Sequence, residues 1–352
     1  MSSNLFSSVI HLNETDRSIT TEQKETGLRA AAIIHFRIAR VDHWVKNVFI
    51  LPGILVAVSM SKEINTAILV RNVVLGMLSA GLIASSNYVL NEILDAPFDR
   101  LHPRKRLRPI ASRLVSIPLA YVQWLVLMAA GLGVAYLVNW PFVLTMVALL
   151  AMGSIYNVRP VRSKDIPYLD VLSEAVNNPI RFIAGWFMVD PHTVAPLSLL
   201  LSYWMVGCYF MAAKRFAEYR EIGDPERASK YRWSFGYYNE KRLLVSILFY
   251  SSVAMLFFGT FMIRYRFELI VSFPFVAWVM AEYLSTAFKK NSAVQAPEKL
   301  YREPVLMVSV VLCALVMGLM LFVDIPALDR LFPPTIQTLF ALVLSPEARG
   351  LS

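Results

Sequence analysis

The stretch "NEILDAPFDRLHPRKRLRP", residues 91–109, places acidic residues at the end of a long apolar segment and a run of basic residues directly after them. The apolar segment begins near Thr66 and is long enough to cross a bilayer as a helix, for which ~20 residues suffice. Because ionised groups are costly in hydrocarbon, an acidic cluster at the end of a membrane span indicates a functional site. The stretch therefore predicts both a helical membrane fold and the place of its site.

Apolar residues dominate the rest of the chain as well. Of its 352 residues, 57% are hydrophobic and 17% are charged, whereas about a quarter of the residues of a soluble domain are charged. Since helices satisfy their own backbone hydrogen bonds in lipid, we predict an all-α integral membrane protein with about nine transmembrane helices. The predicted spans are residues 45–60, 66–95, 114–136, 140–157, 168–188, 193–214, 243–263, 267–288 and 303–323.

The domain organisation expected from this pattern is simple. Residues 37–325 form a single transmembrane domain, preceded by a cytoplasmic tail and interfacial segment over 1–36. The tail is polar and lacks the apolar core and cleavage site of a signal peptide. Residues 326–352 are amphipathic and are expected to lie at the membrane interface.

The basic residues set the expected orientation. The formal net charge is +9, and the Lys and Arg residues concentrate in the loops after the second, fourth, sixth and eighth predicted spans. By the positive-inside rule these loops face the cytoplasm, so the chain is predicted to be a multi-pass protein of the cell inner membrane with a cytoplasmic active site. Lipid headgroups account for most of the basic excess, and no nucleic-acid partner is expected.

One asparagine and two aspartates in this stretch follow helical spacing. Asn91, Asp95 and Asp99 are each four residues apart, so on a helix they stack along one side, drifting by roughly 80° over the set. Pro97 is expected to bend or end the helix because it removes a backbone donor. A helix C-terminus already carries partial negative charge, so acids at this place do not stabilise the helix. Their presence needs another explanation.

A divalent cation would provide one. Mg²⁺ takes one or two carboxylates and completes its coordination with water and phosphate oxygens. The residues predicted to hold Mg²⁺ are Asn91, Glu92, Asp95 and Asp99. The alternative is an acidic helix end that is neutralised by Arg100 and Arg104.

The basic run that follows has two interpretations. It is either the positive-inside signal alone or, beside a metal-binding cluster, a segment that grips the same phosphates. Arginine suits the second role because its planar fork matches two phosphate oxygens. The candidates for phosphate binding in this segment are Arg104, Lys105, Arg106 and Arg108.

The whole segment "NEILDAPFDRLHPRKRLRPIAS", residues 91–112, resembles the first aspartate-rich motif of the UbiA superfamily of membrane prenyltransferases, Asn-Asp/Gln-x-x-Asp-x-x-x-Asp, with Glu92 at the variable second position. Its second half and the upstream "RVDHWVKNVFILPG", residues 40–53, resemble the decaprenyl-phosphate phosphoribosyltransferase branch. The resemblance implies helices around a central cavity that opens to the membrane. It also implies a Mg²⁺-dependent transferase with a phosphorylated donor and a lipid-linked polyprenyl substrate, in which Asn91, Asp95 and Asp99 are catalytic.

Most members of the superfamily carry a second motif, Asp-x-x-x-Asp, at the end of the sixth span. Here that place reads "AAKRFAEYRE", residues 212–221, with Lys214, Arg215 and Glu218 at the corresponding positions. The phosphoribosyltransferase branch resembles this pattern, which implies direct contact between cations and a sugar phosphate that adds about −1.5 to −2 of charge. The alternative is that the Lys–Arg pair belongs only to the positive-inside signal.

Further candidate residues lie near the same predicted membrane face. Those expected to bind substrate are Lys46, Asn47, Tyr156, Arg162, Lys164 and Arg181. Lys46 has an alternative role, since a lysine at a span end also reaches headgroups without binding substrate. Asp170 and Glu174, four residues apart, are predicted to pair with a basic residue, and metal contact is the alternative.

The resemblance favours transfer of phosphoribosyl from phosphoribosyl diphosphate to a polyprenyl phosphate. The alternatives are prenyl transfer from a polyprenyl diphosphate to a small aromatic, quinone or tetrapyrrole precursor, and a transporter whose acids bind ions. Charges at one face rather than at the midplane of broken helices disfavour the transporter. The oligomeric state is left open, a homo-oligomer included.

Overall fold

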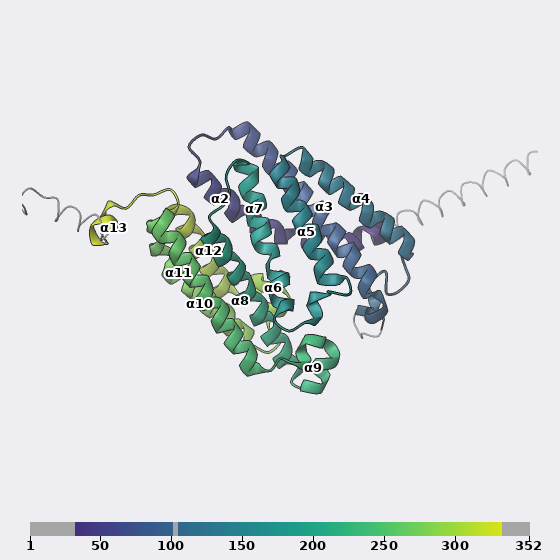
Figure 1. The fold of residues 1–352 in the computed structure, drawn as a ribbon. Helices are drawn as coiled ribbons and strands as arrows, with labels where there is room; N and C mark the ends of the chain where they lie inside the picture. Colours follow the sequence, from purple (N-terminus) through teal and green to yellow (C-terminus); the bar gives the residue numbers. More distant parts are fainter. Residues whose placement is uncertain (1–31, 101–104, 333–352) are drawn as a thin grey trace, which may run out of the picture. The chain divides into compact units, whose positions relative to one another are not determined.

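The computed structural model describes residues 32–100 and 105–332, and the regular elements in these ranges are all helices (Figure 1). The predicted all-α fold is therefore confirmed for the described part of the chain. The described residues form two compact units, one comprising residues up to Phe49 together with Thr66–Arg162, and the other comprising Ile50–Asn65 together with the residues from Ser163 onward.

The first unit is built around one long helix. Its elements are η1 (Val41–Ile50, whose last residue belongs to the second unit), α3 (Thr66–Asp99), η2 (Lys105–Leu107), α4 (Ile117–Tyr136) and α5 (Trp140–Asn157). α3 packs against both α4 and α5. The contact with α4 is close because Gly131 leaves room for Ile83, whose side chain would lie 2.7 Å from a Cβ at that glycine. Small residues commonly permit such close packing between membrane helices.

The second unit contains the remaining helices. They are α2 (Leu51–Met60), η3 (Ser163–Asp165), α6 (Leu169–Ala175), α7 (Asn177–Val189), α8 (Leu197–Ile222), α9 (Pro225–Tyr231), η4 (Trp233–Gly236), α10 (Glu240–Tyr265), η5 (Phe267–Ser272), α11 (Phe273–Ala287), η6 (Ala293–Gln295), η7 (Pro297–Arg302), α12 (Pro304–Met320) and α13 (Pro326–Leu331). The longest packing interface joins α8 to α10 (Figure 1). A buried cluster that includes Tyr209, Phe216 and Tyr250 fills this part of the unit.

Two glycines set the distance between α2 and α7. A Cβ at Gly53 would lie 2.0 Å from the carbonyl oxygen of Phe182, and one at Gly185 would lie 2.2 Å from the carbonyl oxygen of Ile50. Both obstacles are backbone atoms, which do not move aside as a side chain does. The two helices can therefore approach this closely only because both positions lack a side chain.

The hydropathy prediction is largely confirmed, but its count of nine is not. Among the described residues, seven helices are long and apolar enough to cross a membrane: Ala32–Met60, Thr66–Pro97, Ile117–Tyr136, Trp140–Asn157, Leu197–Ile222, Glu240–Tyr265 and Phe267–Ala287. The predicted span 303–323 corresponds to α12, an apolar helix of 17 residues, which is at the short end for a span. The predicted span 168–188 is divided into α6 and α7 at Val176.

A proline explains that division. Pro179 lies in the first turn of α7 and has no backbone N–H to donate to the carbonyl of Ala175, where α6 ends. A hydropathy window does not detect such a break, because the residues on both sides are apolar. At Pro97 the expectation is confirmed, since α3 ends at Asp99 soon after this proline.

Candidate functional site

The acidic end of α3 is surrounded by arginines from other segments of the first unit. Asp99 is buried, and Arg108 Nη1 donates to its Oδ2 at 2.6 Å. Asp95 is half-buried, and Arg162 Nη2 donates to its Oδ1 at 3.2 Å. Arg108 follows the short helix η2, whereas Arg162 follows α5, so two distant parts of the chain meet at the last turns of α3.

Glu92 makes a different kind of contact. Its side chain is buried, its Oε1 accepts a hydrogen bond of 3.2 Å from the backbone N–H of Ile110, and its Oε2 lies 3.7 Å from Arg40 Nη2. The carboxylate thus ties the segment after η2 back onto the middle of the motif. The predicted role of Glu92 as a metal ligand remains a prediction, and its observed contacts are with the protein itself.

These pairings bear on the alternative interpretation, in which Arg100 and Arg104 neutralise the acidic helix end. Arg100 Nε donates instead to the carbonyl oxygen of Ala111 at 3.2 Å, and Arg104 lies outside the described residues. Arg108 and Arg162, both predicted as phosphate-binding residues, are brought to the acids. Of the other basic candidates nearby, Arg106 is exposed and the side chain of Lys105 is not described.

The arrangement fits a cation that arrives with its phosphates. Within the described ranges, no group of three or more His, Cys, Asp or Glu side chains lies close enough to hold a metal ion by itself. Mg²⁺ does not require such a group, because it usually binds through one or two carboxylates and fills its remaining positions with water and substrate phosphate. Asp95 and Asp99, one turn apart on α3 and preceded by the half-buried Asn91, meet this requirement.

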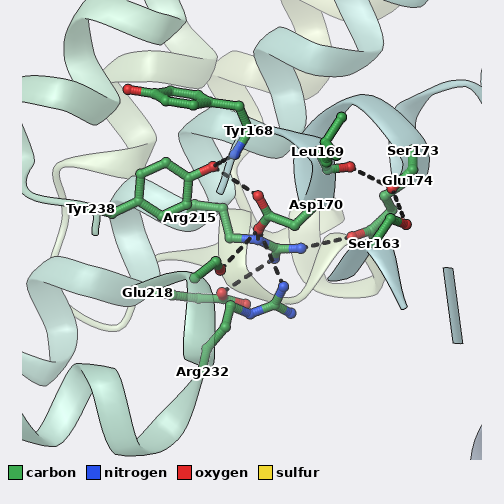
Figure 2. Close-up of polar contacts among 11 residues, drawn as sticks. Ser163, Tyr168, Leu169, Asp170, Ser173, Glu174, Arg215, Glu218, Arg232 and Tyr238 are labelled. Carbon is green, nitrogen blue, oxygen red and sulfur yellow. Dashed lines mark hydrogen bonds and ion pairs between the residues drawn. The ribbon is translucent and has the colours of Figure 1, made fainter. Parts of the chain in front are cut away.

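The second unit contains a separate network of charges around Arg215 on α8. The guanidinium of Arg215, whose side chain is only 1% exposed, contacts the carboxylates of Asp170 at 3.1 Å, Glu174 at 2.7 Å and Glu218 at 3.3 Å (Figure 2). Asp170 and Glu174 project from the short helix α6, and Glu218 lies one turn after Arg215 on α8. The prediction that Asp170 and Glu174 pair with a basic residue is confirmed.

Asp170 is the buried centre of this network. It is fully buried and accepts hydrogen bonds from the Tyr238 hydroxyl at 2.7 Å, from Ser234 Oγ at 3.3 Å and from Arg232 Nη1 at 3.4 Å (Figure 2). Burial, and to a lesser extent the charge of Asp170, raises the pKa of Tyr238 well above its ordinary value. The hydroxyl therefore remains a hydrogen-bond donor at any pH at which the protein works.

Sequence reasoning missed Arg232 and Tyr238. They lie 62 and 68 residues after Asp170, in the connection between α9 and α10. No spacing rule joins residues so far apart. The only available signal was the density of Arg and Tyr residues in "YRWSFGYYNEKR", residues 231–242, which is also expected for any loop at a membrane interface.

The remaining candidates are found at several places. Lys46 Nζ lies 5.8 Å from the centre of the Tyr88 ring, and the neighbouring Asn47 is buried. Arg181 Nη1 donates to the carbonyl oxygen of Asn177 at 3.4 Å, within α7. The others are half-buried: Tyr156 on α5, Lys164 in η3 and Lys214 on α8.

A family comparison decides the identity of this fold. The profile of the UbiA prenyltransferase family matches residues 48–301, well over half of the chain, including the acidic end of α3 and the Arg215 network. The chain belongs to the UbiA prenyltransferase family. Together with its seven apolar helices, this makes it an integral membrane protein, and it confirms the expected transferase class at the level of the family.

Individual relatives agree with this assignment. The decaprenyl-phosphate phosphoribosyltransferase of Mycobacterium tuberculosis is 33% identical over 181 residues, covering 51% of this chain and 58% of that protein. The protein of the same name in Mycolicibacterium smegmatis is 31% identical over 180 residues, covering 51% of this chain and 55% of that protein. The chain thus spans little more than half the length of these curated relatives.

A solved structure confirms the fold. A UbiA homologue from Archaeoglobus fulgidus, bound to DMAPP and Mg²⁺, superposes with a TM-score of 0.61 at 20% sequence identity. The alignment covers 82% of this chain and 98% of the other. At this identity the likeness establishes the UbiA fold of the chain and nothing about its ligands.

Proposed function

We propose that this UbiA-family protein transfers a phosphoribosyl group from phosphoribosyl diphosphate to a polyprenyl phosphate in the membrane, with Mg²⁺ held at the acidic end of α3. The observation that carries the proposal is the pairing of Asp95 and Asp99 with Arg162 and Arg108. Two stacked carboxylates that are flanked by guanidinium groups suit a cation–diphosphate complex. The named relatives support the phosphoribosyl donor.

The proposed reaction is a substitution at C1 of the ribose. The bond between C1 and the diphosphate oxygen breaks, and a phosphate oxygen of the lipid acceptor forms the new bond to C1. Asn91, Asp95 and Asp99 would hold Mg²⁺, which supplies positive charge to the leaving diphosphate. Because the acceptor is already an anion, the reaction needs no strong general base.

Arg108 and Arg162 would serve two purposes in this reaction. Each holds an acid of α3 in place and offsets part of the repulsion between the two like-charged carboxylates. Each also has further guanidinium N–H groups beyond the one that donates to the acid, and five such donors per arginine suffice for an additional phosphate contact. Positioning and charge neutralisation of this kind are the main contributions a protein makes to transfer from a diphosphate.

For the second motif we propose a division of labour between Lys214 and Arg215. The Arg215 guanidinium is surrounded by three carboxylates, so its charge is used within the protein. Lys214 is half-buried on the same helix and is the better candidate for a contact with the sugar phosphate. Arg215 would then be a positioning residue, which orders Glu174 and Glu218 beside it.

Prenyl transfer from a polyprenyl diphosphate to a small acceptor is the second candidate. It is favoured by one observation, that the solved Archaeoglobus fulgidus homologues are bound to prenyl donors, DMAPP in one and GPP in another, with Mg²⁺. The same acidic end of α3 would serve this donor, since diphosphate is the leaving group of both donors.

The proposal can be tested with the purified full chain in detergent. The protein is supplied with Mg²⁺, ribose-labelled phosphoribosyl diphosphate and a polyprenyl phosphate, and label in the organic phase is counted with and without a chelator. Chelator-sensitive label in the lipid is expected, together with its loss in Asp95→Asn and its retention in the matched control Glu226→Gln on the exposed face of α9. Label that persists in Asp95→Asn or in the presence of the chelator would overturn the proposal.

A further inference from the structure

A pocket lies wholly within the second unit, at the start of α10. It has a volume of about 630 Å³ and is lined by Tyr168, Asn239, Lys241, Arg242, Val245, Ser246, Phe249 and Tyr250. This volume is within the range of small-molecule sites, about 300–1,000 Å³, and is far larger than a bare phosphate ion needs. None of the residues used in the proposed transfer lines it.

The first turn of α10 supplies the groups of the pocket that are suited to an anion. Lys241 and Arg242 lie at its rim in the first turn of α10, and both side chains are exposed. Arg242 is held by stacking on the Tyr237 ring, with its guanidinium carbon 4.2 Å from the ring centre, and Arg242 Nη1 donates to the Tyr237 carbonyl oxygen at 2.6 Å. The N-terminus of α10 adds partial positive charge at the same place.

Two residues of low exposure also line the pocket. Tyr250 is only 4% exposed. Ser246, one turn earlier on α10, is 8% exposed, and its hydroxyl donates to the Leu243 carbonyl oxygen. The Ser246 hydroxyl is therefore already used within the helix, and the groups that favour an anion are the two cationic side chains at the start of α10.

The other wall of the pocket is apolar and continues along the helix. Val245 and Phe249 line the pocket, and both are well exposed, as is Leu248 beside them. They follow Arg242 at helical spacing on α10, which is one of the candidate membrane spans. Arg242 and Tyr250 are eight residues apart, which corresponds to about 12 Å along the axis. The pocket is therefore cationic at the end of the span and apolar toward the interior of the span.

From this arrangement we propose that the pocket at the start of α10 binds an anionic membrane phospholipid, with its phosphate between Lys241 and Arg242 and its chains along Val245 and Phe249. A cationic site at the first turn of a span lies at the depth of lipid headgroups. A phospholipid fits the pocket better than a soluble phosphate does, because a soluble phosphate would leave the apolar wall and most of the volume unoccupied. The proposal is independent of which group the enzyme transfers.

The network of Asp170 connects to this pocket through Tyr168. The Tyr168 backbone N–H donates to the Tyr238 hydroxyl at 2.6 Å, and that hydroxyl donates to Asp170. The Tyr168 ring packs edge-on against the rings of both Tyr237 and Tyr238. A bound lipid would thus contact Tyr168, which is connected through the Tyr238 hydroxyl to Asp170 at the centre of the Arg215 network.

Native mass spectrometry of the purified full chain in lipid-containing micelles tests the proposal. Phosphatidylglycerol is the anionic probe and phosphatidylcholine the zwitterionic one, and bound lipid is measured for each variant. The double variant Lys241→Gln/Arg242→Gln is expected to weaken retention of phosphatidylglycerol by about tenfold to thirtyfold.

The matched control is Arg227→Gln/Lys230→Gln, which removes the same charge from exposed positions on α9. It is expected to retain phosphatidylglycerol within twofold of the wild type. Equal loss in this control, equal retention of the two lipids, or unchanged retention in the double variant of the pocket would overturn the proposal. Displacement of the lipid by millimolar glycerol phosphate would also overturn it, because the site would then take a soluble phosphate.

Discussion

Replacing Arg215 by Met tests the physical role of the largest fully buried side chain among the described residues. The guanidinium forms ion pairs with Asp170, Glu174 and Glu218, of which Asp170 is fully buried. Met keeps much of the side-chain volume, so the packing of α8 changes little, and the loss is mainly electrostatic. Removing one partner of a buried ion pair costs about 3–5 kcal/mol, because an uncompensated charge remains in the interior.

The remaining contacts of the acids refine the expected loss of stability. Asp170 retains Arg232, Ser234 and Tyr238 as donors, so it is not left alone, and Glu174 is 30% exposed and can take up water. We therefore expect Arg215→Met to lie near the lower end, at about 3 kcal/mol. Arg215→Lys should cost less, about 1.5–3 kcal/mol, because an ammonium keeps the charge but cannot reach three acids in a fixed fork.

The assay is reversible unfolding by a denaturing detergent in mixed micelles, followed by far-ultraviolet circular dichroism. Combining Arg215→Met with Asp170→Asn completes a double-mutant cycle, and the coupling between the two sites should be about 1–3 kcal/mol. Arg227→Met, on the exposed α9, is the control and should change stability by less than about 0.5 kcal/mol. A stable Arg215→Met protein, with a cost below about 1 kcal/mol and a raised KM for the donor, would refute this account and restore Arg215 as a phosphate clamp.

Two further predictions concern other contacts. The Glu92→Gln substitution weakens the ion pair with Arg40, but the new side chain can still accept from the Ile110 N–H. It should therefore cost about 1–2 kcal/mol of stability and leave the apparent Mg²⁺ affinity within about threefold. A much larger loss of Mg²⁺ affinity would make Glu92 a metal ligand instead. The Gly53→Ala substitution should destabilise the protein by about 1–3 kcal/mol, because the new Cβ meets the Phe182 carbonyl. The control is Gly259→Ala on α10, where a Cβ meets nothing within 4 Å, and it should be neutral or slightly stabilising. Equal effects of the two substitutions in the unfolding assay would contradict the close approach of α2 and α7.

Much of the fold could be predicted from the sequence because the bilayer imposes one simple requirement. A helix that crosses it needs a long apolar segment, and the hydropathy pattern locates α3, α4, α5, α8 and α10. The division at Val176 was not predicted, because it depends on one missing backbone donor at Pro179 rather than on polarity. Hydropathy therefore does not register a break within a span that a local hydrogen bond, and not transfer to lipid, decides.

The site was predictable only where its residues share a helix. Asp95 and Asp99 are joined by helical periodicity, and so are Asp170 and Glu174. Their partners could not be identified by spacing, since Arg162 is 67 residues from Asp95 and Arg215 is 45 residues from Asp170. The resemblance implied that Arg215 would contact phosphate, whereas its burial and its three acidic neighbours appear only once the helices are packed.

A competition between the two possible donors tests the central claim most directly. The purified full chain is given Mg²⁺, a polyprenyl phosphate, a set of small aromatic acceptors, and equal amounts of ribose-labelled phosphoribosyl diphosphate and prenyl-labelled polyprenyl diphosphate carrying different isotopes. The account predicts that the ribose label moves into the lipid phase, that the prenyl label stays on its diphosphate, and that a chelator stops the transfer. Transfer of the prenyl label to an acceptor with the ribose label left in the aqueous phase would contradict it.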